Sequence, residues 1–291
     1  MPEEQKSWTV IKLLSWSTEF LKNKGVENPR LCVEWLLCEV LKFDRVQLYL
    51  HFDRPLVLDE LASFKKLLLR RADREPLQYI LGFTEFYSLK FFVKKGVLIP
   101  RPETELLVEK TLALCSDIDG EIRVLDIGAG SGNISIALAK NNPQIRVTAV
   151  DISPEAIAVA RENAAYHEVL DKIEFIQGDI GDNSFVGQLI QPFDIIVSNP
   201  PYIANSEKPD LEPEVVNFEP EIALFCEDSL KFYKIIAQLT ERVLKKSGHL
   251  ICEIGSEQGE QVTGIFTIQT FQDVTVVPDL TGRNRFVYAK K

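Results

Sequence analysis

The chain has 291 residues, of which 45% are hydrophobic and 26% charged, which is typical of a soluble globular protein with about two domains. No stretch approaches the roughly 20 uncharged apolar residues of a membrane-spanning helix, and the N-terminal MPEEQKSWTV carries acids where a secretion signal has bases. We therefore expect a cytoplasmic protein with no membrane partner. The net charge is −10, and residues 91–291 alone carry −11, which disfavours non-specific binding to nucleic acid.

Residues 1–76 are predicted to form a small helical domain. Apolar residues recur at helical spacing around Leu13 and around Leu36, and a third helix is predicted over residues 59–72. Asn28, which a proline follows, is predicted to cap the start of the second helix. The basic residues near the third helix are interpreted as a solvated face, with docking of an acidic partner or of nucleic acid as the alternative. They are Lys65, Lys66, Arg70, Arg71 and Arg74.

Residues 77–100 have a different composition from the helical segment before them. They are rich in aromatic and β-branched residues, and Gly82 and Gly96 interrupt them. This composition predicts a β-hairpin that links two domains.

Residues 101–291 alternate between predicted strands and helices. The strands are expected at 122–127, 145–150, 173–177, 194–198, 249–254, 273–277 and 285–289. Helices are expected at 132–140, from Ser153 onward, near 184–190, at 229–246 and near 256–267. Apolar, β-branched strands in this alternation indicate an α/β fold whose mostly parallel sheet is covered on both faces.

Cysteine and histidine residues give no sign of a metal site. The cysteines are odd in number and scattered, without a C-x-x-C pair, so we expect reduced and mostly buried thiols. The three histidines are widely spaced, and no G-x-S-x-G sequence of a triad hydrolase is present. We expect no metal in this protein.

A glycine-rich turn follows the first predicted strand of the α/β segment. It comprises Asp126, Ile127, Gly128, Ala129, Gly130, Ser131 and Gly132. Glycines at such a turn let the backbone bend tightly and lie against a ligand. Asp151, at the end of the next strand, stands where a carboxylate accepts hydrogen bonds from both ribose hydroxyls of a nucleoside. These features together predict a nucleoside cofactor.

The spacing of the turn differs from the G-x-G-x-x-G sequence of dinucleotide sites. It is G-x-G-x-G with Asp126 two residues earlier, and it resembles the first motif of class I S-adenosylmethionine-dependent methyltransferases, which have a Rossmann-like fold. The resemblance implies S-adenosyl-L-methionine as cofactor, bound by residues 128–132, by Asp151 and Asn199, and by Asp126, directly or through the loop. It also implies that Asp179 meets the adenine amine and that Ile180 packs beside the adenine ring.

Asn199, Pro200, Pro201 and Tyr202 follow the predicted strand at 194–198. Consecutive prolines stiffen the backbone, so that the Asn199 side chain and the Pro200 carbonyl can both accept hydrogens from one planar NH₂ group. Tyr202 offers a flat face for the substrate. We predict that Asn199, Pro200 and Tyr202 are catalytic and that all four residues bind substrate. This sequence leaves open a glutamine amide and the N6 amine of adenine in DNA or RNA.

Further sequences distinguish these substrates by resemblance. They are EPLQYILG at 75–82, Phe86-Tyr87, IPRPETE at 99–105 and GRNR at 282–285. With the two motifs above, the chain resembles the PrmC/HemK family of protein-(glutamine-N5) methyltransferases over nearly its whole length. The resemblance implies methylation of the glutamine in the Gly-Gly-Gln motif of class 1 peptide chain release factors. It also implies that the N-terminal helical domain and the hairpin dock the factor.

Overall fold

The computed structural model describes residues 8–189, 192–268 and 271–291, and they divide into two compact units. The helical unit contains the residues up to Gly82 together with Pro213–Phe218. The α/β unit contains Phe83–Glu212 and Glu219–Lys291. The helical part thus extends to Gly82 and includes a segment from the C-terminal half of the chain. The roles predicted for residues 1–76, 77–100 and 101–291 stay a prediction.

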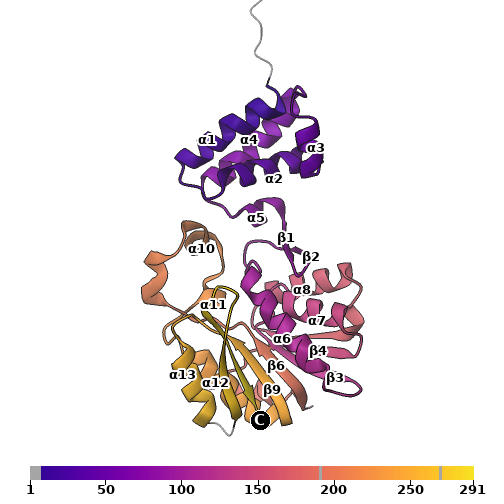
Figure 1. Ribbon diagram of the computed structural model, residues 1–291, viewed down its shortest axis with the longest axis vertical. Helices are drawn as coiled ribbons and strands as arrows, with labels where there is room; N and C mark the ends of the chain where they lie inside the picture. Colours follow the sequence, from indigo (N-terminus) through magenta and orange to yellow (C-terminus); the bar gives the residue numbers. More distant parts are fainter. Residues whose placement is uncertain (1–7, 190–191, 269–270) are drawn as a thin grey trace, which may run out of the picture. The chain divides into compact units, whose positions relative to one another are not determined.

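The helical unit is a small bundle with its own apolar core (Figure 1). Its helices are α1 (Val10–Asn23), α2 (Pro29–Leu41), α3 (Arg45–Leu50), α4 (Leu58–Ala72), α5 (Leu77–Leu81) and α10 (Pro213–Phe218). Leu21, Leu36 and Phe64 are among the buried residues at its centre. Asn28 occupies the N-cap position of α2 as predicted, but its side chain forms no capping hydrogen bond because its backbone is left-handed, with φ of 46°.

The predicted hairpin is shorter than residues 77–100. Leu77–Leu81 is the helix α5, because Ile80 packs into the core of the bundle and Gly82 ends the helix with φ of 80°. The hairpin itself comprises β1 (Phe83–Phe86) and β2 (Leu89–Phe92), which pair antiparallel. Aromatic composition alone did not distinguish a buried helical turn from a strand.

The prediction of a solvated basic face at α4 is wrong for Arg71 and Arg74. Arg71 is only 5% exposed, and its Nη2 donates to Oε1 of Glu214 at 2.8 Å. Nη2 of Arg74 donates to the other oxygen of Glu214 at 2.6 Å. Because Glu214 lies in α10, these ion pairs hold residues 213–218 within the helical unit.

The α/β unit is built on a seven-stranded sheet in the order β10-β11-β9-β6-β3-β4-β5. Its strands are β3 (Ile122–Ile127), β4 (Ile145–Asp151), β5 (Ile173–Gln177), β6 (Phe193–Ser198), β9 (Leu244–Glu253), β10 (Gln272–Pro278) and β11 (Asn284–Lys290). The pairs among β5, β4, β3, β6 and β9 are parallel, and β11 pairs antiparallel with β9 and β10. Every strand predicted for this sheet is present, which confirms the α/β fold of the Rossmann-like class.

Helices cover both faces of this sheet. They are α6 (Glu105–Cys115), α7 (Asn133–Asn141), α8 (Pro154–Tyr166), α9 (Asn183–Val186), α11 (Glu221–Leu224), α12 (Lys231–Val243) and α13 (Gly259–Ile268). The helices α6, α7 and α8 lie on one face, and α12 and α13 lie on the other (Figure 1). Neighbouring residues of β3, such as Val124 and Leu125, enter separate cores on the two faces.

Two predicted helices are shorter than expected. The helix expected near 184–190 ends at Val186 within the described residues, and residue 190 lies outside them. The helix expected at 229–246 is α12 and ends at Val243, because Leu244 already belongs to β9. All five cysteines are buried and free. Among the residues that the structure describes, no helix has the length and apolar character to cross a membrane.

Candidate active site

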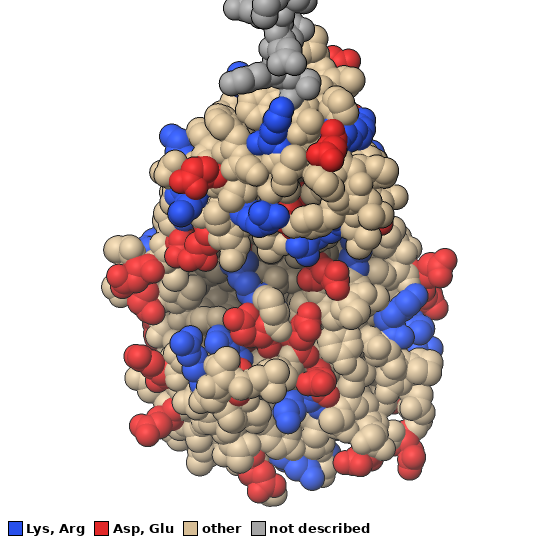
Figure 2. Space-filling view, turned by 45° about the horizontal axis from the view of Figure 1, so that its top comes forward, with Lys and Arg blue, Asp and Glu red and all other residues tan. Residues whose placement is uncertain are grey.

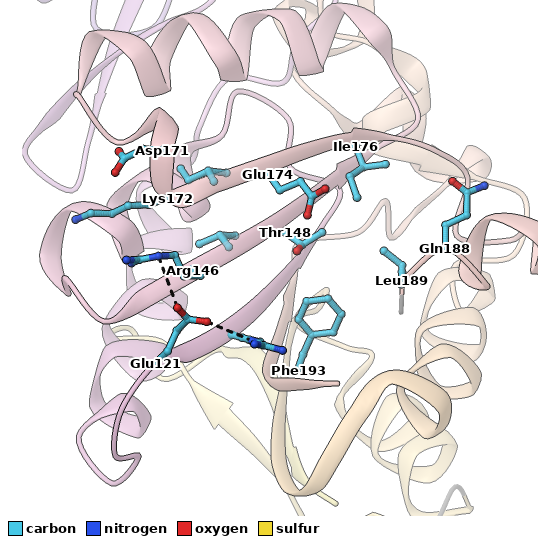
Figure 3. Close-up of a pocket in the computed structure, with 13 residues that line it drawn as sticks. Glu121, Arg146, Thr148, Asp171, Lys172, Glu174, Ile176, Gln188, Leu189 and Phe193 are labelled. Atoms are coloured by element: carbon cyan, nitrogen blue, oxygen red, sulfur yellow. Dashed lines mark hydrogen bonds and ion pairs between the residues drawn. The ribbon is translucent and has the colours of Figure 1, made fainter. Parts of the chain in front are cut away.

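Two cavities of the α/β unit lie at opposite ends of its parallel strands. The amino-end cavity, of about 620 Å³, is lined by residues near the starts of β3, β4, β5 and β6. There Glu121 lies between two cations, 3.4 Å from Nε of Arg123 and 3.9 Å from Nε of Arg146 (Figure 3). The whole lining of this cavity carries three acidic and three basic side chains, so its charges balance. Ligands of open α/β sheets bind at the carboxyl ends of the strands, which favours the other cavity.

The carboxyl-end cavity has a volume of about 540 Å³ and lies where β3, β4, β5 and β6 end. Eight of the predicted site residues line it: Gly128, Gly130, Asp151, Asp179, Ile180, Asn199, Pro200 and Pro201. The residues of the remaining walls carry no motif that predicts them from the sequence. They include Val97, Leu98, Ile222, Ala223, Lys231 and Phe232.

The glycine-rich turn is fixed to the neighbouring strand by its backbone. The N–H groups of Gly128 and Ala129 both donate to the carbonyl of Val150, at 2.8 and 3.0 Å. Gly132 has φ of 80°, and a Cβ there would lie 3.1 Å from the Cβ of Ala160 in α8. Gly132 therefore permits both the left-handed backbone and the close packing of the turn against α8.

Asp151 connects the glycine-rich turn to the cavity. Its Oδ2 accepts from the Gly130 N–H at 2.8 Å, and its Oδ1 accepts from the Ser153 N–H at 2.9 Å. Burial raises the pKa of Asp151, and the hydrogen bonds from Ser153 and Gly130 oppose this rise. Because each carboxylate oxygen can accept a second hydrogen bond, Asp151 can hold the turn and a ligand together.

Asp126 is placed differently from Asp151. Its side chain is fully buried and is not part of the cavity wall. Ser135 Oγ donates to its Oδ2 at 2.5 Å, while its Oδ1 has no hydrogen-bond partner among the described residues. Burial raises the pKa of Asp126 to about 7. Ala129, Ser131 and Gly132 do not line the cavity either. This arrangement favours an indirect role for Asp126, which would act on a ligand through the glycine-rich turn.

The turn after β5 forms another wall of the cavity through Asp179 and Ile180. Oδ1 of Asp179 accepts from the Gly181 N–H at 2.7 Å, which fixes the shape of the turn. The ring of Phe185 lies directly over Gly178, where a Cβ would be 2.1 Å from the ring. A glycine at 178 is thus required for this turn to close over α9.

Asn199 lies at the end of β6 and faces the cavity with Pro200 and Pro201. Its Nδ2 donates to Oγ1 of Thr104 at 3.2 Å, and this hydroxyl donates to Oε2 of Glu253 at 2.7 Å. Thr104 ends the 3₁₀ helix Pro102–Thr104, and Glu253 ends β9. Thr104 and Glu253 are site residues that the sequence analysis missed. The available signals were the IPRPETE sequence, which contains Thr104, and an acid at the end of an apolar strand.

Tyr202 is the one residue of the four-residue motif that does not line the carboxyl-end cavity. Its side chain is partly buried against the core that α12 and α13 cover, and this burial raises its pKa. Its carbonyl accepts from Nε2 of Gln258 at 3.0 Å. The stacking role predicted for the Tyr202 ring stays a prediction.

Cys226 fixes the backbone that follows the two prolines. Residues Ile203–Ala204 (β7) pair in parallel with Phe225–Cys226 (β8). The Cys226 thiol lies 3.6 Å from the carbonyl oxygen of Pro201, to which it donates a hydrogen bond. The motif is therefore held by main-chain and side-chain contacts on both sides.

Two family models match the chain. The model described as PrmC N-terminal domain matches residues 12–82, and the model described as methyltransferase domain matches residues 118–274. Together they cover the helical bundle and most of the α/β unit.

Curated relatives match along nearly the full chain. The release factor glutamine methyltransferase of Geobacter sulfurreducens is 44% identical over 99% of this chain and 98% of its own length. The protein of the same name from Chlorobaculum tepidum is 41% identical over 98% of each chain.

Solved structures share the fold at low identity. A methyltransferase from Pyrococcus furiosus has a TM-score of 0.51 at 16% identity, over 70% of this chain and 89% of its own. The catalytic domain of hMettl16 in complex with an RNA hairpin has a TM-score of 0.55 at 18% identity, over 79% and 80%. At these identities the likeness concerns the fold alone.

Proposed function

The chain belongs to the release factor glutamine methyltransferase family, and from this premise we propose its reaction. It transfers a methyl group from S-adenosyl-L-methionine to the side-chain nitrogen N5 of a glutamine. The glutamine is that of the Gly-Gly-Gln motif in class 1 peptide chain release factors. The observation that carries the proposal is that Asn199 and Pro200 line the same cavity as Asp151 and the glycine-rich turn.

The cavity suits S-adenosyl-L-methionine by its donor set. Asp151 keeps acceptor capacity for two vicinal ribose hydroxyls, and Gly128 and Gly130 let the cofactor approach the backbone. Asp179 and Ile180 are assigned to the adenine end. Ile180 is aliphatic, so it contributes apolar contact beside the ring. When bound, this cofactor supplies an electrophilic methyl group.

The chain's own residues orient the nitrogen that receives the methyl group. An amide nitrogen is a poor nucleophile, because its lone pair is delocalised into the neighbouring carbonyl. Asn199 and the Pro200 carbonyl accept the two hydrogens of the glutamine NH₂, which raises electron density on nitrogen and directs its lone pair out of the plane. Alignment contributes most to the rate, since effective molarities correspond to about 7 kcal/mol or more. The proton leaves after transfer, when the nitrogen is strongly acidic.

The helical unit is assigned to docking of the release factor. Large apolar side chains are exposed on it, including Leu58 at 83%, Leu50 at 71% and Val46 at 68%. Large apolar side chains exposed in this way are available for a protein–protein contact. The proposal locates the reaction in the cytoplasm, where release factors act on the ribosome.

The test is incubation of the purified protein with methyl-labelled S-adenosyl-L-methionine and a class 1 release factor. We expect label on the factor and none when the Gly-Gly-Gln glutamine is replaced by alanine. Asn199→Ala should abolish turnover and leave cofactor affinity within about threefold. Retained turnover in this variant would contradict the role given to Asn199.

Duplex DNA in a parallel reaction tests methylation of adenine. The charge of residues 91–291 is −11, and acidic and basic side chains are interspersed on the face seen in Figure 2. Such a charge distribution weakens attraction to a phosphate backbone. We expect no label on DNA. Label on DNA alone would overturn the proposed substrate and retain the cofactor.

A further inference from the structure

A chain of hydrogen bonds leads from Asn199, in the wall of the carboxyl-end cavity, to the buried side chains of Thr104 and Glu253. It leads from Nδ2 of Asn199 to Oγ1 of Thr104, at 3.2 Å, and from this hydroxyl to Oε2 of Glu253, at 2.7 Å. Thr104 and Glu253 are each 1% exposed, so water does not compete for the bond between these two residues. Neither residue lines the cavity.

The sheet brings together Asn199 and Glu253, the two ends of this series of hydrogen bonds. β6 and β9 pair in parallel, with Ser198 opposite Cys252, so that Asn199 and Glu253 follow at the same edge. Thr104 lies at the start of α6, and its contact with Glu253 joins residues 149 positions apart. The three residues therefore meet only in the folded α/β unit.

The order of donors and acceptors gives this series of hydrogen bonds a direction. An ionised carboxylate can only accept, and a threonine hydroxyl has a single proton to donate. While the Thr104 hydroxyl donates its hydrogen bond to Glu253, Oγ1 can only accept from Asn199. The Asn199 amide must therefore turn its NH₂ group toward Thr104. The oxygen branch of the amide is then the one that can accept hydrogens from a substrate.

The charge on Glu253 is set by its surroundings. Burial raises its pKa to about 7, and the hydrogen bond from Thr104 opposes that rise. Arg285 and Arg101 favour the charged form, and Glu103 disfavours it. At pH 8 the carboxylate is therefore the acceptor that ends the chain.

We propose that Thr104 and Glu253 are positioning residues that fix the Asn199 amide with its oxygen toward the substrate nitrogen. This inference rests on the proposed function and adds two residues to it. It also assigns a role to the threonine of the IPRPETE sequence. Thr104 and Glu253 act through Asn199 and touch neither substrate nor cofactor.

Steady-state kinetics at pH 8 with release factor test this proposal. Thr104→Val removes the hydroxyl at nearly constant volume, and we expect kcat to fall about 10- to 100-fold, as for other residues that orient a ligand-binding group. The KM for release factor and the affinity for S-adenosylhomocysteine, measured by calorimetry, should stay within about threefold. Thr104→Ser should restore most of the lost kcat because it retains the hydroxyl.

Glu253→Gln tests the direction of the chain. The NH₂ group of glutamine can donate to Thr104. The Thr104 hydroxyl is then free to donate to the Asn199 side-chain oxygen, which flips the Asn199 amide by about 180°. We expect kcat to fall, but less than in Thr104→Val, because the glutamine oxygen can still accept from Thr104 and keep the original direction in part of the molecules. Thr111→Val is the matched control, since Thr111 is a buried threonine whose hydroxyl donates to a backbone carbonyl in α6.

A readout that needs no activity is the side-chain amide signal of Asn199 in ¹⁵N-labelled protein. We expect this NH₂ group to exchange slowly in wild type and in Thr111→Val, and at least tenfold faster in Thr104→Val. An unchanged kcat and an unchanged exchange rate of the Asn199 NH₂ group in Thr104→Val would overturn the positioning role of Thr104 and Glu253. Wild-type protein that does not methylate release factor would instead overturn the proposed function, while the exchange experiment would still decide the geometry.

Discussion

Asn163 and Phe92 are joined by two hydrogen bonds between a side-chain amide and a backbone. Oδ1 of Asn163 accepts from the Phe92 N–H at 2.7 Å, and Nδ2 donates to the Phe92 carbonyl at 3.1 Å. The same Nδ2 donates to the carbonyl of Ser131 at 2.9 Å. One buried residue of α8 therefore holds both the hairpin and the glycine-rich turn.

Asn163→Ala should lower the free energy of unfolding by about 3 kcal/mol, because it leaves buried backbone groups without partners. Calorimetry or urea denaturation followed by circular dichroism measures this change. Asn141→Ala is the control, since Asn141 is exposed and makes one bond within α7. Equal losses in the two variants would contradict the anchoring role of Asn163.

The fold of the α/β unit could be predicted from sequence because its information is local. Strands such as Ile122–Ile127 are rich in apolar and β-branched residues, which fit a sheet buried on both faces. The position of Pro213–Phe218 in the helical unit could not be predicted in this way. It depends on the contact of Arg71 with Glu214, residues 143 positions apart, and neither residue has a local pattern that indicates it.

In the candidate site, too, some residues could be predicted from local sequence and others could not. Gly128, Gly130 and Asp151 have positions that any parallel βα unit brings together, so their spacing predicts their meeting. Glu253 looked like part of an ordinary strand, and its partner Thr104 stands 149 positions away at the start of α6, where no local pattern connects the two. The sequence indicates a substrate contact for Tyr202, which stays a prediction; in the structure its partly buried side chain packs against the core.

Gly178→Ala should lower the free energy of unfolding by about 1 to 3 kcal/mol. The added methyl would lie 2.1 Å from the Phe185 ring, so the ring or the turn must move. Gly178→Ala combined with Phe185→Leu should lose less stability than the sum of the two single changes. Gly264→Ala is the control, because nothing lies within 4 Å of its added Cβ in α13. A fully additive double variant would argue against the clash.

Asp151→Ala should weaken binding of S-adenosylhomocysteine about 100-fold. The change removes the acceptor for two ribose hydroxyls, and hydrogen bonds to a charged group contribute about 1.5 to 3 kcal/mol each. Titration calorimetry measures the affinity. The control is Glu155→Ala, which removes an exposed carboxylate near Asp151 that does not line the cavity. An Asp151→Ala affinity within threefold of wild type would remove Asp151 from the cofactor site.

Because of Asp126, the free energy of unfolding should decrease as the pH rises from about 4 to about 7. Burial raises the pKa of its carboxyl from 3.8 to about 7 in the folded state. Over this interval the folded protein holds a proton that the unfolded chain has released, so unfolding becomes easier with rising pH. The loss is at most about 1.4 kcal/mol per pH unit and ends above pH 7.

Asp126→Asn tests this dependence because asparagine is neutral at every pH and similar in shape. Unfolding free energies at pH 5, 6, 7 and 8 should fall less steeply in the variant than in wild type. Glu253 adds a slope of the same sign, so a residual slope is expected in the variant. Asp117→Asn, an exposed control, should follow wild type. Parallel curves for Asp126→Asn and wild type would mean that Asp126 is already ionised in the folded protein, with its charge stabilised from the glycine-rich turn.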